Sequence, residues 1–78
     1  MIKYLNKSGK SSVLGYSFTE NSISILFEDQ KFIYTYNELK PGVVKVHRMI
    51  RYAQAGKGLN SYIKTEVKGN YSLKTPAR

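Results

Sequence analysis

The stretch SISILFEDQKFIYTY (residues 22–36) decides the fold, because apolar or aromatic side chains occupy every second position in both of its halves. This alternation of β-branched and aromatic residues is typical of β-strands. The polar letters EDQ between the halves are few enough for a hairpin turn. A turn at Asp29 and Gln30 predicts these opposed pairs on one face: Phe27 with Phe32, Ile25 with Tyr34, and Ile23 with Tyr36.

A third strand, residues 12–18, precedes this hairpin. Three of its side chains share one side by alternation: Leu14, Tyr16 and Phe18. With a short polar turn after this strand, the same side continues the apolar face of the hairpin, which gives a three-stranded antiparallel meander. A face of this kind must be covered. We therefore interpret Tyr34 and Tyr36 as core residues under a helix, in preference to an open platform on which bases stack.

The residues after the hairpin predict two helices as the cover. Pro41 suits a helix entry, and from Val43 to Ala55 apolar side chains fall on one stripe at helical spacing. That stripe consists of Val43, Val46, Met49, Ile50 and Ala53. The glycines of residues 56–58 end this helix. A shorter helix over residues 59–67 turns three side chains inward: Leu59, Ile63 and Val67.

The predicted fold class is α+β, with a three-stranded antiparallel meander covered on one face by a longer amphipathic helix and a short C-terminal helix. This single domain spans residues 12–67. A basic N-terminal segment, residues 1–11, precedes it, and a frayed basic tail, residues 68–78, follows it, with Gly69 and Pro76 as breakers. A chain of 78 residues has room for one small core.

Composition points away from catalysis. The chain has no cysteine, which excludes thiolate chemistry and cysteine-ligated zinc and fits a reducing compartment. His47 is the only histidine, and no acid lies three or four positions away to orient it. The carboxylates are dispersed without metal-ligand spacing. No apolar run approaches the ~20 residues that span a bilayer. We expect a cytoplasmic protein that is not an enzyme and uses no metal, cofactor or membrane.

The net charge of +8 belongs mainly to the second half of the chain. Residues 40–78 hold nine basic residues against the single acid Glu66, whereas residues 20–39 are net acidic. A one-sided excess of positive charge favours a polyanionic partner, with nucleic acid ahead of an acidic protein surface. Charge that serves only solubility is the alternative interpretation.

The basic face of the predicted longer helix is the best candidate site. Lys45, Arg48 and Tyr52 lie at i, i+3 and i+7 and so form one exposed ridge. Arginine forks onto phosphates, and an exposed tyrosine stacks on bases. No acid lies between residues 40 and 60, although ordinary solvated faces mix the two signs. The predicted contact residues for nucleic acid or a partner are Lys45, Arg48, Arg51, Tyr52, Lys57 and Lys64.

The letters AGKG (residues 55–58) leave two interpretations open. Gly56 and Gly58 let the backbone approach a phosphate closely, Lys57 adds charge, and a helix begins just after them. An ordinary glycine helix end is the favoured alternative. Asn60 poses a parallel choice, in which a capping or first-turn role is favoured over ligand contact.

The order of motifs from Ser12 to Ile63 resembles the KTSC domain, a small module named from the C-terminus of certain lysyl-tRNA synthetases that also occurs as free-standing bacterial and phage proteins. The matching letters are Gly15-Tyr16, the strand Ile23–Phe27, Tyr34-Thr35-Tyr36, Pro41, and the ending Ala53, Gly56, Leu59, Asn60 and Ile63. Gln54 and Gly58 depart from the usual serine and aromatic residues of that ending. The resemblance implies a shared fold and, for function, no more than RNA binding.

These observations favour a small, non-catalytic nucleic-acid-binding domain, with RNA ahead of DNA, that contacts phosphates through the basic helix face. The alternative is a phage-type protein inhibitor or interaction module, whose positive surface binds an acidic site on a larger host assembly. The oligomeric state, and any association through the second face of the sheet, stay open.

Overall fold

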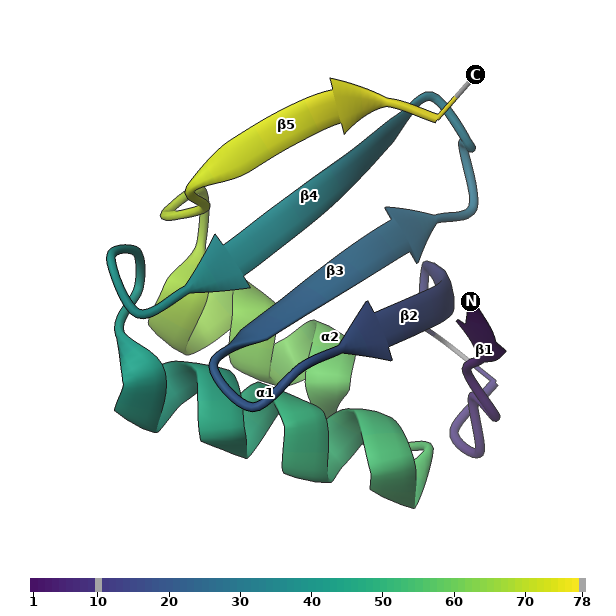
Figure 1. Ribbon diagram of the computed structural model, residues 1–78. Helices are drawn as coiled ribbons and strands as arrows, with labels where there is room; N and C mark the ends of the chain where they lie inside the picture. Colours follow the sequence, from purple (N-terminus) through teal and green to yellow (C-terminus); the bar gives the residue numbers. More distant parts are fainter. Residues whose placement is uncertain (10, 78) are drawn as a thin grey trace.

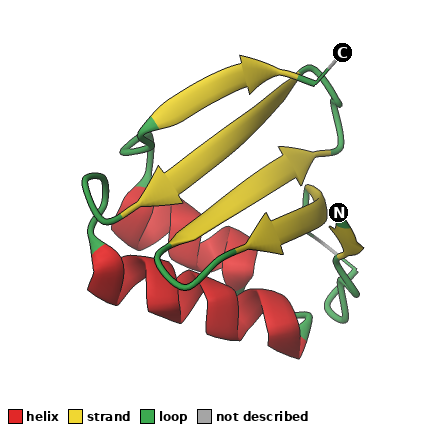
Figure 2. Ribbon diagram, in the orientation of Figure 1, coloured by secondary structure: helices red, strands yellow, loops and turns green. Residues whose placement is uncertain are grey.

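The computed structural model describes residues 1–9 and 11–77 and has an α+β fold, with helices packed on one face of a five-stranded antiparallel sheet (Figure 1; Figure 2). Lys10 and Arg78, which belong to the predicted basic N-terminal segment and basic tail, lie outside the described residues. The strands follow chain order across the sheet: β1 (Ile2–Lys3), β2 (Val13–Phe18), β3 (Ser22–Phe27), β4 (Phe32–Asn37) and β5 (Leu73–Pro76). The helices are α1 (Val43–Ala55), α2 (Leu59–Tyr62) and the π-helical segment η1 (Ile63–Val67).

The register of β3 and β4 confirms the predicted pairing of Ile25 with Tyr34 and of Ile23 with Tyr36. The first hairpin places Tyr16 opposite Ile25 and Phe18 opposite Ile23. These residues share the face that the helices cover, since directly opposed side chains point the same way. The hydrophobic pattern was therefore sufficient to set the register of this part of the sheet.

The sheet has five strands, whereas we predicted three. The additional strands come from segments that we placed outside the domain: β1 pairs with β2, and β5 pairs with β4. Four residues of the predicted frayed tail are thus a strand, and Ser72 N–H also donates to Thr35 O at 2.8 Å. A three-stranded sheet would leave the outer backbone groups of β2 and β4 unpaired, and two short segments satisfy them.

The start of β2 corrects a second prediction. We expected Leu14 on the buried face, but Leu14 is 39% exposed and Val13 is 2% exposed. The pairing with β3 shifts between Val13 and Gly15, which marks a β-bulge at this point. An extra residue in one strand reverses the alternation of side chains upstream of it. The bulge therefore exchanges the two faces for the first residues of β2.

Helix α1 has the predicted bounds, and its stripe is buried at Val46, Met49 and Ala53. Val43, which we also placed on the stripe, is 38% exposed. The helix ends at Gly56, which adopts a left-handed conformation (φ = 79°) and donates its N–H to the carbonyls of Tyr52 and Ala53. This is the ordinary glycine helix end that we favoured for these letters.

The second helix covers the predicted range but changes geometry along it, since four α-helical residues in α2 lead directly into η1. Its predicted inward residues, Leu59, Ile63 and Val67, are buried. The core between the sheet and the helices contains these large, fully buried side chains: Ile23, Ile25, Tyr36, Val46, Met49 and Leu59. Within the described residues, no helix is long and apolar enough to cross a membrane.

The two tyrosines of β4 differ in burial, although we assigned both to the core. Tyr36 is 2% exposed, and burial, with smaller contributions from Tyr34 and Tyr71, raises its pKa to about 12. Tyr34 is only half-buried. Tyr36 therefore belongs to the core, whereas Tyr34 keeps an exposed part.

Candidate nucleic-acid interface

Two arginines form the free cationic part of the outer face of α1. Arg48 and Arg51 are exposed, and their spacing of three residues places them on neighbouring positions of the helix surface. Among the described residues, no carboxylate forms an ion pair with either guanidinium group. Both side chains keep their full hydrogen-bonding capacity for an external anion such as a phosphate.

Lys45, the first residue of the predicted ridge, has a partner within the protein. Its Nζ donates a hydrogen bond to the backbone oxygen of Glu66 at 2.7 Å. That carbonyl belongs to the last turn of η1, where the helix dipole carries partial negative charge. Lys45 therefore joins α1 to η1, and its ammonium group is not the free cation that we expected.

Three of the six predicted contact residues come together in one hollow beside the end of α1. Arg51, Tyr52 and Lys57 line a cavity of about 470 Å³. Its other lining residues are Ser8, Ala55 and Gly58. Lys45, Arg48 and Lys64 do not line it, and Lys64 is exposed on η1. The arrangement brings the side chains of two basic residues and one tyrosine together around one opening with a largely apolar lining, which we name the basic hollow.

The ring of Tyr52 is held in place by two neighbours. Its centroid lies 5.2 Å from that of Tyr62 at a tilt of 40°. Gly58 approaches so closely that a Cβ there would lie 2.9 Å from Tyr52 Cδ1. Tyr52 as a whole is 38% exposed. A tyrosine with a fixed position and an exposed part needs little ordering to stack on a planar ligand.

The loop before α2 has a packing role. Gly58 has φ = 86°, a conformation that favours glycine. Asn60 accepts a hydrogen bond from Ser12 Oγ at 3.1 Å through its Oδ1 atom, and so ties α2 to the start of β2. Both residues thereby position the helix, and α2 is too short for us to assign an anion site to its N-terminus.

His47 has a structural contact on the opposite part of α1. Its Nε2 atom lies 3.0 Å from the backbone oxygen of Glu20, which joins the helix to the turn between β2 and β3. In residues 1–9 and 11–77, no three His, Cys, Asp or Glu side chains gather in a way that could hold a metal ion. His47 therefore has a structural role, because it fixes the turn before β3 to α1.

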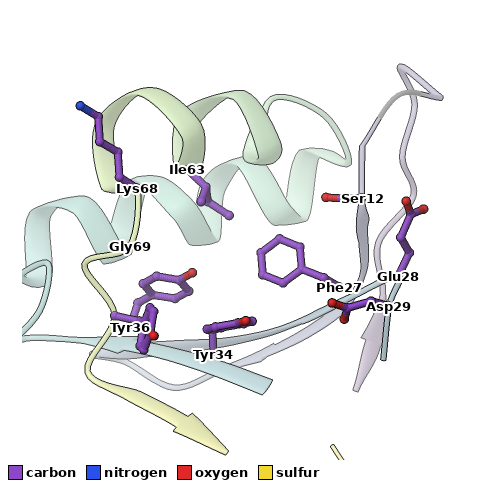
Figure 3. A pocket seen from close by; sticks show the side chains of 10 residues that line it. Ser12, Phe27, Glu28, Asp29, Tyr34, Tyr36, Ile63, Lys68 and Gly69 are labelled. Atoms are coloured by element: carbon purple, nitrogen blue, oxygen red, sulfur yellow. The ribbon is translucent and has the colours of Figure 1, made fainter. Parts of the chain in front are cut away.

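A second hollow was not predicted. It has a volume of about 450 Å³ and lies between the sheet and η1 (Figure 3). Its lining residues are Ser12, Phe27, Glu28, Asp29, Tyr34, Tyr36, Ile63, Lys68, Gly69 and Tyr71. We name it the aromatic hollow. We expected the helices to cover Tyr34 and the tail to be frayed, so we did not predict a hollow here. The only sign of it in the sequence was that Phe27, Tyr34 and Tyr36 share one face of the sheet.

Comparison with known proteins finds no match for this chain: no family model, no curated protein and no solved structure is similar to it at a significant level. The resemblance to the KTSC domain accordingly stays a prediction.

Proposed function

We propose that this chain is a small, non-catalytic RNA-binding module that contacts phosphates through the exposed cations of α1 and the loop after it. The single observation that carries the proposal is the basic hollow, in which Arg51, Tyr52 and Lys57 surround one opening. The net charge of +8 adds a long-range attraction for a polyanion.

The chemistry of the three side chains is complementary to a single strand. The Arg51 guanidinium group offers paired donors to phosphate oxygens, and Lys57 adds a second positive charge. Between them the Tyr52 ring offers a face to a base, and stacking on an aromatic side chain stabilises such complexes by about 1–3 kcal/mol per base. Single-stranded RNA presents unstacked bases in loops and ends, which favours RNA over a DNA duplex.

The proposal is tested by fluorescence anisotropy of a labelled single-stranded RNA at about 50 mM and about 200 mM salt. Contacts to three phosphates predict that log K falls against log salt with a slope of about −2. Arg51→Ala combined with Lys57→Ala is expected to weaken binding at least tenfold and to flatten that slope. Lys3→Ala combined with Lys40→Ala removes the same charge from exposed positions outside the basic hollow and is the matched control.

Absence of binding at the lower salt concentration overturns the proposal, and equal losses in the two double variants reduce it to non-specific charge attraction. A pull-down with and without nuclease then separates the remaining possibility. A protein partner that is retained in stoichiometric amount after nuclease treatment indicates the inhibitor or interaction module.

A further inference from the structure

The aromatic hollow is lined by residues that take no part in the proposed contacts along α1. Its volume of about 450 Å³ lies in the range of small-molecule sites. Phe27, Tyr34 and Ile63 face its middle, Glu28 and Asp29 lie at one end, and Lys68 lies at the other (Figure 3). A ligand here meets rings in the centre and acidic residues at one end, whereas the Lys68 side chain is directed outward from the opposite end.

The rings in this hollow meet at steep angles. Phe27 lies against Tyr34 with centroids 5.5 Å apart and planes 74° apart. Tyr71 lies against the same ring at 5.0 Å and 68°. A planar group that stacks on Tyr34 therefore meets the other two rings at their edges or faces, which holds it in one orientation. Because Tyr34 is half-buried, its ring is firmly packed but still reaches the opening.

The charges around the rings argue against a cationic ligand. Lys74 Nζ already lies 4.3 Å from the centroid of Phe32 and 5.7 Å from that of Tyr34. Lys68 lines the aromatic hollow together with Glu28 and Asp29, and the whole chain carries +8. A second cation over Phe32 and Tyr34 would be repelled by Lys74. Aromatic faces next to lysines suit a stacked base whose phosphates lie near the ammonium groups.

The acidic end favours one kind of base. The side chain of Asp29 accepts a hydrogen bond from Lys31 N–H at 3.1 Å and so belongs to the hairpin turn. The carboxylate of Glu28 has no partner among the described residues. Its two oxygens can accept two parallel donors. Guanine presents such a pair, N1–H and the 2-amino group, whereas adenine places an acceptor beside its amino group.

Polar side chains connect the two hollows. Ser8 and Gly58 line the basic hollow and also a small recess that contains Ser11, Asn60 and Ser61. Asn60 in turn accepts the hydrogen bond of Ser12, which lines the aromatic hollow. The recess with Asn60 therefore lies between the two hollows.

We propose that the aromatic hollow takes an unpaired guanine base of a bound RNA strand, with Tyr34 as the stacking surface and Glu28 as the acceptor for the Watson–Crick edge. This inference rests on the proposed RNA-binding function and adds a base preference to it. The preference follows from Glu28, because its second carboxylate oxygen would accept a hydrogen bond from the 2-amino group of guanine. Inosine lacks this group.

The test compares labelled uridine-rich RNAs of about twelve nucleotides that differ at one central base, guanine, inosine or adenine. We expect the guanine RNA to bind about tenfold more tightly than the other two, as one well-placed bidentate pair discriminates between bases. Glu28→Gln should abolish this preference and leave the inosine RNA bound as tightly as before or more tightly. Glu20→Gln removes the same charge from another exposed turn and should keep the preference.

Tyr34→Leu should weaken the guanine RNA about tenfold, and circular dichroism checks that this variant is folded. Because Glu28 is exposed, Glu28→Gln keeps the test decisive if Tyr34→Leu does not fold. Equal affinity of the wild-type protein for all three RNAs overturns the guanine site but not the RNA-binding function. A guanine preference that survives Glu28→Gln has the same consequence. Failure to bind any of the RNAs at low salt overturns both.

Discussion

Replacing Gly58 by alanine tests how the loop after α1 positions Tyr52. Gly58 has φ = 86°, and a residue with a side chain in this left-handed conformation loses about 1–2 kcal/mol. The added Cβ would lie 2.9 Å from Tyr52 Cδ1, and forcing the ring away from its preferred rotamer costs about 1 kcal/mol more. We expect the free energy of unfolding to fall by about 2–3 kcal/mol, which lowers the Tm by roughly 10–20 °C in a domain of this size.

Two other glycines separate the contributions. Gly9 has φ = 72° with open space around its Cβ position, so Gly9→Ala should show only the conformational cost of about 1–2 kcal/mol. Gly69 has neither a left-handed φ nor a close neighbour, so Gly69→Ala should be neutral or stabilise by up to about 1 kcal/mol through the unfolded state. Thermal and urea unfolding, followed by circular dichroism, measure all three variants.

The same variants carry a functional prediction. Displacement of the Tyr52 ring should weaken RNA binding by about tenfold in Gly58→Ala, because a stacking contact is lost. Gly9→Ala should bind RNA as the wild-type protein does at temperatures where both are folded. If Gly58→Ala unfolds at the same temperature as Gly9→Ala, the contact of the added Cβ with Tyr52 costs no stability and this part of the argument is wrong. If it binds RNA with unchanged affinity, Tyr52 is not a stacking residue.

Three further variants test other parts of the structure. Because the folded-state pKa of Tyr36 is about 12 and the unfolded value is near 10, its contribution is complete below pH 10 and lost as pH rises toward 12. The free energy of unfolding should therefore fall by about 2–3 kcal/mol over that window, and a urea-unfolding series in which Tyr36→Phe shows the same fall would contradict this. Lys45→Met removes the hydrogen bond to Glu66 O and should lower stability by about 1 kcal/mol with less than a twofold loss of RNA affinity; a tenfold loss would make Lys45 a contact residue after all. The buried hydroxyl of Tyr62 has no hydrogen-bond partner in residues 1–9 and 11–77, so Tyr62→Phe should raise stability by about 1 kcal/mol in urea unfolding. A clear loss of stability would mean that the hydroxyl has a partner.

The aromatic hollow lies where the helices cover the sheet only in part. The helices cover the end of the sheet that contains Ile23 and Tyr36, both fully buried. They leave the end with Phe32 and Tyr34 only partly covered. One long and one short helix thus cover only part of the five-stranded sheet, and Tyr34 lines the aromatic hollow where the cover is incomplete.

Many residues of the candidate site were predictable from the sequence, but which of them lie together in one hollow was not. The basic character of α1 follows from helical spacing, which brings Arg48 and Arg51 to the surface. Spacing alone does not reveal that Lys45 reaches Glu66 O, since the two residues are 21 positions apart and lie in different helices. Nor does it reveal that Lys57 and Tyr52 share one hollow, because that depends on the left-handed turn at Gly58.

The sequence by itself determined the central hairpin, its register and the bounds of α1. These features depend on neighbours along the chain or directly across one short turn, so the alternation around Ile25 and Tyr34 and the stripe through Met49 were enough. Only the tertiary structure decided the bulge at the start of β2, the edge strands and the aromatic hollow. Each of these arises when distant segments compete for the same backbone groups or the same apolar surface, as Tyr71 does when it packs on Tyr34, and local pattern carries no record of that competition.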